Sequence, residues 1–224
     1  MAVIHGEIRQ FHDEAGQASV RGLLHAPATA TGDGLVLTHG AGANCEAPLL
    51  AALAEAFCDA GMSVLRCDLP FRQMRSHGPP MRGSAERDQA GLRRAVEAMR
   101  KIVPGRVFLG GHSYGGRQAS MLAANEPGLV PALLLLSYPL HPPKKREEMR
   151  TAHFPSLQTP AMFVSGIRDG FGTIEEIRGA LKLIPARTEL LAIERAGHEL
   201  MTAKNREGLV KRVVEAFLRF IGDE

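Results

Sequence analysis

The sequence has no tryptophan and only three cysteines, Cys45, Cys58 and Cys67. These cysteines are odd in number and form no C-x-x-C pair. A disulfide framework and a structural zinc site both need paired cysteines, so this pattern disfavours both and favours a reducing compartment. We therefore expect a cytoplasmic protein without a bound metal.

Long apolar runs and a strong net charge are also missing. No apolar run approaches the length needed to span a bilayer, and residues 1–9 lack the apolar core of a signal peptide. The formal net charge is +3 and the Lys and Arg residues are scattered, which indicates neither nucleic-acid nor membrane binding. With 224 residues, 45% of them hydrophobic, and no repeat or low-complexity tract, we expect one globular domain over residues 1–224.

Strand and helix patterns alternate along the chain. The first two strands are expected near Ile4 to Phe11 and Ser19 to Ala26, with the alternation typical of an antiparallel edge pair. Short apolar runs predict buried parallel strands at 35–39, 63–67, 106–110, 133–137, 161–165 and 190–193. Helical patterns lie between them at 46–60, 84–102, 117–125, 174–183 and 203–221. This order predicts an α/β fold, a mostly parallel sheet with helices on both faces and ligand sites at the carboxyl ends of the strands.

The stretch 107–117 carries the strongest functional signal. An apolar strand runs directly into the G-x-S-x-G sequence centred on Ser113 and then into a helical pattern. This is the context of a nucleophile elbow, where Gly111 and Gly115 flank a turn too tight for larger side chains. Ser113 is therefore the predicted nucleophile.

Two cofactor interpretations of the glycine-rich segments fail. A phosphate-binding loop needs Lys and then a hydroxyl residue after its last glycine, but Arg117 and Gln118 stand there. A dinucleotide fingerprint beginning at Gly40 needs a glycine at position 45, which is Cys45. We therefore expect no cofactor.

A serine nucleophile needs a base to take its proton and a third group to orient that base. In the hydrolase fold these follow in the order Ser, Asp or Glu, His. Asp169 and His198 each come directly after a predicted strand, and each is the only candidate of its type in its interval. We expect Ser113, Asp169 and His198 to form a catalytic triad, although either of the last two taken singly also suits a capping role.

Two backbone N–H groups are expected to bind the oxyanion. In this fold one comes from the residue after the nucleophile, here Tyr114, and the other from the loop after an early strand. In that loop Ala41 is the first candidate and Gly42 the second. His39 precedes Ser113, against the expected order, so we assign it to the substrate site as a residue that braces the loop.

These motifs resemble those of the alpha/beta-hydrolases, most closely the small dienelactone-hydrolase-like branch. The resemblance spans nearly the whole chain and is carried by the runs 39–43, 111–117, 136–143 and 166–172. It implies an alpha/beta-hydrolase fold and an acyl-enzyme mechanism. Dienelactone hydrolases carry cysteine where this chain has Ser113, so their own activity is not implied. The similar subset includes a scaffold subunit of a chromatin acetyltransferase complex, which makes a non-catalytic scaffold or binding module the alternative.

The segment 138–160 between two predicted strands is too short for a large helical lid. We therefore expect an open site and carboxylesterase-like action on a small-molecule acyl substrate, with thioester and amide leaving groups as open alternatives. Arg72 and Arg75 are expected at the mouth of the site, where they would favour an anionic substrate. Arg82 and the basic run 144–146 are expected to extend this rim.

Overall fold

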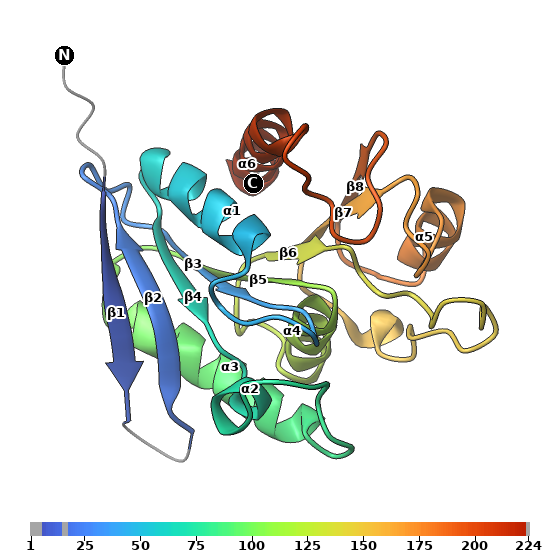
Figure 1. Cartoon of the computed structure of the whole chain (residues 1–224), viewed down its shortest axis with the longest axis horizontal. Coiled ribbons are helices and arrows are strands. Elements are labelled where there is room, and N and C mark those ends of the chain that lie inside the picture. The colour runs from blue at the N-terminus through green and yellow to red at the C-terminus, as the bar shows by residue number, and fades with distance from the viewer. Residues whose placement is uncertain (1–5, 15–17, 223–224) are drawn as a thin grey trace.

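The computed structural model describes residues 6–14 and 18–222, which form one eight-stranded sheet with helices on both faces (Figure 1). The strands are β1 (Glu7–Asp13), β2 (Val20–Ala26), β3 (Gly34–Thr38), β4 (Ser63–Cys67), β5 (Val107–His112), β6 (Leu133–Leu136), β7 (Ala161–Gly166) and β8 (Thr188–Ile193). Their order is β1-β2-β4-β3-β5-β6-β7-β8. β2 pairs antiparallel with β1 and β4, and every other pair is parallel, which confirms the predicted sheet.

The helices divide into two layers. They are α1 (Pro48–Asp59), α2 (Pro70–Met74), α3 (Ala85–Arg100), α4 (Tyr114–Asn125), α5 (Ile174–Leu181) and α6 (Arg206–Gly222), with the 3-10 helix η1 (Phe154–Ser156). One hydrophobic cluster joins α1 and α6 to the sheet, and the other joins α3, α4 and α5 to the opposite face (Figure 1). Burial of both faces explains why the central strands read as continuous apolar runs.

Several boundaries differ from the predictions. α1 begins at Pro48 because proline fits the first helical position and the preceding residues are held in a turn, with the Glu46 N–H donating to Asn44 Oδ1. α4 begins at Tyr114, three residues earlier than expected, so the helix starts immediately after the nucleophile candidate. α2 and η1 were not predicted. Residues 4–5 of the first expected strand lie outside the described residues.

Segments that follow the carboxyl ends of β3, β4, β5, β7 and β8 carry the predicted site residues to one edge of the sheet. Between β6 and β7, residues 137–160 contain only the short helix η1, which confirms the expectation of a fold without a large lid. Across the described residues, no helix combines the length and apolarity needed to cross a membrane.

Candidate active site

The strand β5 and the helix α4 are joined by a single residue, Ser113. Its backbone has φ 50° and ψ −114°, a conformation that is costly for a residue with a side chain. The Ser113 N–H donates to the Leu136 carbonyl at 2.8 Å, which ties the turn to β6. A Cβ on Gly111 would lie 2.7 Å from the Gly115 carbonyl carbon, and a Cβ on Gly115 would lie 2.5 Å from the His39 oxygen. The turn therefore requires glycine at both flanking positions.

Three predicted side chains from separate loops meet beside this turn. His198 Nε2 lies 2.8 Å from Ser113 Oγ, and His198 Nδ1 lies 2.9 Å from Asp169 Oδ2 and 3.0 Å from Asp169 Oδ1. A carboxylate accepts hydrogen bonds, so Nδ1 carries the proton and Nε2 is left as the acceptor for the serine hydroxyl. The Phe171 N–H donates to Asp169 Oδ1 at 2.8 Å and helps to fix the carboxylate. The arrangement suits proton transfer from Ser113.

Two further residues hold the His198 ring in place. The ring of Phe171 lies 4.1 Å from that of His198 with an interplanar angle of 31°. His112 Nε2 donates to the His198 carbonyl at 3.0 Å, and its ring lies 5.4 Å from the His198 ring. Burial lowers the pKa of His112, so its imidazole is neutral at pH 7 and serves as a hydrogen-bond donor rather than a charge. Within residues 6–14 and 18–222, no cluster of His, Cys, Asp or Glu is arranged to hold a metal.

The loop after β3 lies directly against the nucleophile turn. A Cβ built on Gly40 would come within 3.5 Å of Ser113 Cβ. Among the described residues, the N–H groups of Ala41 and Gly42 donate to no backbone carbonyl. The N–H of Tyr114 is the first of α4, a position without an acceptor inside the helix. The Tyr114 N–H thus adjoins Ser113, and the Ala41 and Gly42 N–H groups belong to the loop that contacts it through Gly40.

Arg72 does not occupy the rim that the sequence suggested. Its side chain is 4% exposed, and its guanidinium donates to the carbonyls of Ala41 at 2.8 Å, Ala43 at 2.8 Å, Gly78 at 3.0 Å and Arg75 at 3.2 Å. A buried guanidinium needs acceptors, and α2 points this one inward toward the loop that carries them. Arg72 therefore braces the loop after β3, whereas Arg75 is exposed.

His39 is also fully buried and is used within the protein. Its Nδ1 donates to the Gly40 carbonyl at 2.8 Å and its Nε2 accepts from the Leu69 N–H at 3.1 Å. Burial lowers its pKa, in keeping with a neutral ring that makes one donor and one acceptor bond. This is the expected bracing role. His39 also contributes to a pocket of about 230 Å³ beside the nucleophile turn, whose lining includes Gly40, Pro48, Leu49, Leu50 and His112.

The role of Asp88 in the core was not predicted. This fully buried residue of α3 accepts from the Tyr114 hydroxyl at 2.7 Å and from the Phe71 N–H at 3.0 Å. Burial raises the pKa of the Asp88 carboxyl. The residue thus links α3 to α2 and to the first residue of α4. An acidic residue in the first turn of a helix is common for electrostatic reasons alone, so the pattern carried no functional signal.

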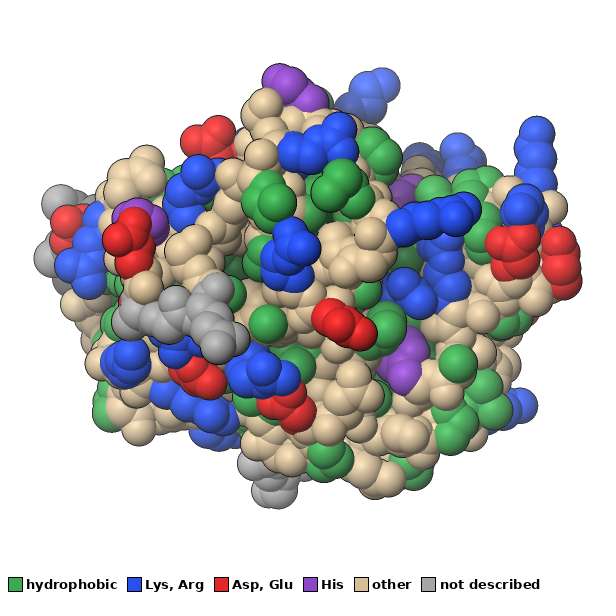
Figure 2. Space-filling view, turned by 90° about the horizontal axis from the view of Figure 1, so that it is seen from below, with side chains coloured by type: hydrophobic (Ala, Val, Ile, Leu, Met, Phe, Trp, Pro, Cys, Tyr) green, Lys and Arg blue, Asp and Glu red, His purple; other side chains and the backbone are tan. Residues whose placement is uncertain are grey.

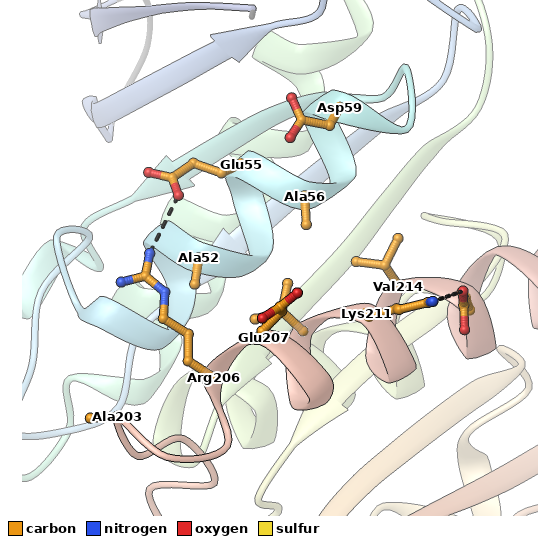
Figure 3. A pocket seen from close by; sticks show the side chains of 11 residues that line it. Ala52, Glu55, Ala56, Asp59, Ala203, Arg206, Glu207, Lys211 and Val214 are labelled. Carbon is orange, nitrogen blue, oxygen red and sulfur yellow. Dashed lines mark ion pairs between the residues drawn. The ribbon is translucent and has the colours of Figure 1, made fainter. Parts of the chain in front are cut away.

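A second hollow lies away from these residues. It is a groove of about 730 Å³ between α1 and α6 (Figure 3). Ala52, Ala56 and Val214 contribute apolar side chains, and the ion pair between Arg206 and Glu55 at 3.5 Å crosses its edge. The groove shares no lining residue with the pocket beside Ser113.

Comparison with known proteins agrees with this fold. The family described as alpha/beta hydrolase domain matches residues 31–222. A dienelactone hydrolase from Anabaena variabilis superposes with a TM-score of 0.76 at 21% identity, covering 96% of this chain and 98% of that one. Est1E from Butyrivibrio proteoclasticus, solved with ferulic acid, gives 0.78 at 17% identity and covers 95% and 100%. The Xanthomonas campestris protein XC6422, described as a serine hydrolase without lid, gives 0.66 at 15% identity and covers 96% and 95%.

The match over residues 31–222 shows that the chain belongs to the alpha/beta-hydrolase family. Its structural relatives include proteins of the dienelactone-hydrolase-like branch, as the sequence motifs indicated.

Proposed function

We propose that this protein is a serine hydrolase that cleaves esters through Ser113, His198 and Asp169. The observation that carries the proposal is the engagement of both imidazole nitrogens of His198, one with Ser113 Oγ at 2.8 Å and the other with the Asp169 carboxylate at 2.9 Å. A base so placed lets a serine hydroxyl act as a nucleophile at neutral pH.

The chemical steps follow from these positions. His198 Nε2 takes the hydroxyl proton as Ser113 Oγ attacks the ester carbonyl, and the N–H groups of Ala41 and Tyr114 stabilise the oxyanion. The tetrahedral intermediate collapses to an acyl-enzyme as His198 returns the proton to the leaving alcohol. Water, deprotonated by His198, then attacks the acyl group and releases the acid and free Ser113. Asp169 keeps the imidazole oriented and stabilises its positive charge.

Three features favour a small-molecule ester as the substrate. Residues 137–160 contribute only the short helix η1, and a pocket of about 230 Å³ lined by His112, the neighbour of Ser113, also includes the apolar side chains of Leu49 and Leu50. Est1E, which shares the fold, was solved with the small acid ferulic acid. Thioesters and amides would use the same groups, so the leaving group is a matter for assay.

Labelling with a fluorophosphonate probe tests the proposal against a scaffold that has kept the fold without turnover. We expect one adduct per chain on Ser113, measured by intact mass and peptide mapping, and none in Ser113→Ala. The exposed Ser19→Ala variant is the matched control and should label fully. Circular dichroism shows whether each variant is folded. Absence of labelling in folded wild-type protein would support the scaffold alternative.

A further inference from the structure

Asp88 is a buried acid without a basic partner. It is fully buried on α3, and among the described residues it makes no ion pair, although Arg93 and Arg94 of the same helix do. Figure 2 looks at the molecule from the side of α2 and α3, and several acidic side chains on that surface lie beside Lys or Arg. A buried carboxylate without an opposite charge is costly, and an apolar side chain would fill the same space at lower cost. The place of Asp88 in the core therefore depends on the groups that its two oxygens hold.

One oxygen of Asp88 holds the residue that follows the nucleophile candidate. The Tyr114 hydroxyl donates to Asp88 Oδ2 at 2.7 Å, and Ser84 Oγ lies 3.3 Å from the same hydroxyl. The Tyr114 ring packs edge-on against the Phe71 ring, with centroids 5.6 Å apart. Tyr114 is the first residue of α4, and its N–H is one of the two expected oxyanion donors. A side chain fixed at both its ring and its hydroxyl limits the movement of its own backbone N–H.

The other oxygen of Asp88 holds the short helix α2. The Phe71 N–H, in the first turn of this helix, has no acceptor inside the helix and donates to Asp88 Oδ1 at 3.0 Å. The next residue, Arg72, donates to the carbonyls of Ala41 and Ala43 at 2.8 Å each. A helix of five residues is too short to be stable alone, so its position depends on such outside contacts. Asp88 therefore anchors the helix that braces the loop of Ala41.

We propose that Asp88 is a positioning residue that holds both oxyanion donors in place. It reaches Tyr114 directly through the hydroxyl. It reaches Ala41 through Phe71 and Arg72, which are neighbours on α2. Because a displacement of about 1 Å in a catalytic site can cost about 10²-fold in rate, an anchor shared by the two donors bears directly on catalysis. This inference rests on the proposed function and adds a residue to it.

Two esters that differ in one atom report on the oxyanion donors. p-Nitrophenyl butyrate develops negative charge on oxygen in the tetrahedral intermediate, whereas O-p-nitrophenyl thionobutyrate develops it on sulfur, which is larger and a weaker hydrogen-bond acceptor. Two well-placed N–H groups therefore favour the oxygen ester, and the ratio of kcat/KM for the oxygen ester to that for the thiono ester measures their placement. Partial unfolding of a variant lowers both rates together and leaves this ratio unchanged.

Asp88→Ala removes both links. We expect kcat on p-nitrophenyl butyrate to fall about 10- to 100-fold with little change in KM, and the ratio of oxygen to thiono ester to fall about tenfold, because part of the contribution of the oxyanion donors is lost. Asp88→Asn should recover most of kcat and of the ratio, since its amide accepts from the Phe71 N–H and donates to the Tyr114 hydroxyl oxygen. Val96, fully buried two turns further along α3, provides the matched control: Val96→Ala should destabilise the chain and keep the wild-type ratio.

An unchanged ratio in folded Asp88→Ala protein would overturn the inference, as would an equal fall in Val96→Ala or a lack of recovery in Asp88→Asn. If Asp88→Ala does not fold by circular dichroism, Tyr114→Phe, which removes only the hydroxyl link, should still lower the ratio about threefold. An unchanged ratio in that variant refutes the inference equally. Failure of the proposed function is recognised separately, because wild-type protein would then hydrolyse neither ester, and the inference falls with it.

Discussion

Replacement of Arg72 separates a bracing role from the substrate-binding role that the sequence suggested. Two of its hydrogen bonds, both 2.8 Å, hold the carbonyls of Ala41 and Ala43 in the loop after β3. Hydrogen bonds from a charged donor contribute about 1.5–3 kcal/mol each, so the two are worth about 3–6 kcal/mol. Water entering the vacated space recovers part of this. We expect Arg72→Gln to lower the free energy of unfolding by about 2–4 kcal/mol.

The same variant should slow catalysis without regard to substrate charge. The loop carries the Ala41 N–H, and loss of one oxyanion donor costs about 10²–10³ in kcat. A loosened loop forfeits part of that contribution, so kcat/KM should fall about 10- to 100-fold for neutral and anionic esters alike. Arg72→Lys keeps the charge but lacks the branched guanidinium that reaches several carbonyls, so neither the free energy of unfolding nor kcat/KM should return to its wild-type value.

Urea unfolding and kinetics on an anionic and a neutral ester, mono-p-nitrophenyl glutarate and its methyl ester, measure these effects. Arg75→Gln removes an exposed side chain and should change the free energy of unfolding by no more than about 0.5 kcal/mol. A selective loss of the anionic ester in Arg72→Gln, with stability unchanged, would refute the bracing role and return Arg72 to the rim of the site.

Three other variants test separate parts of the account. Gly111→Ala would put a methyl group 2.7 Å from backbone atoms at the start of α4, and should lower the free energy of unfolding by about 2–3 kcal/mol in urea titrations; wild-type stability would show that the turn tolerates a side chain. His25 Nε2 accepts from Arg66 Nε at 2.9 Å, and burial, followed by the charge of Arg66, lowers its pKa to about 4. As the pH falls below 6.5, His25 takes up a proton in the unfolded chain before it does so in the folded protein. This residue should therefore make the free energy of unfolding fall by up to about 1.4 kcal/mol for each pH unit from pH 6.5 down to pH 4. His25→Gln should flatten this slope, and an unchanged slope in the variant would contradict the assignment. Asp169→Asn should lower kcat about 10⁴-fold in ester assays while the chain stays folded, because the amide no longer fixes the proton of His198 on Nδ1; a loss of less than tenfold would exclude this role.

The sheet could be predicted from the sequence because its central strands are buried on both faces and therefore appear as short apolar runs. The site residues that follow strand ends could also be predicted, because the carboxyl ends of parallel strands meet at one edge of the sheet. Asp169 and His198, 29 residues apart, could be assigned to the same place as Ser113 on that rule alone.

Features that depend on irregular segments could not be predicted. The helix α2 has only five residues, too few for a periodic pattern, and its direction decides that Arg72 points inward. The start of α4 was placed too late because the three residues after Ser113 include two glycines, which disfavour helix in isolation.

The central claim is that Ser113 Oγ becomes acylated, and mass spectrometry of protein quenched in acid during turnover of p-nitrophenyl butyrate tests it directly. We predict a butyryl adduct on the peptide that contains Ser113, with no adduct and no turnover above background in Ser113→Ala. Undiminished hydrolysis by folded Ser113→Ala protein, or a butyryl group confined to another residue, would contradict the account.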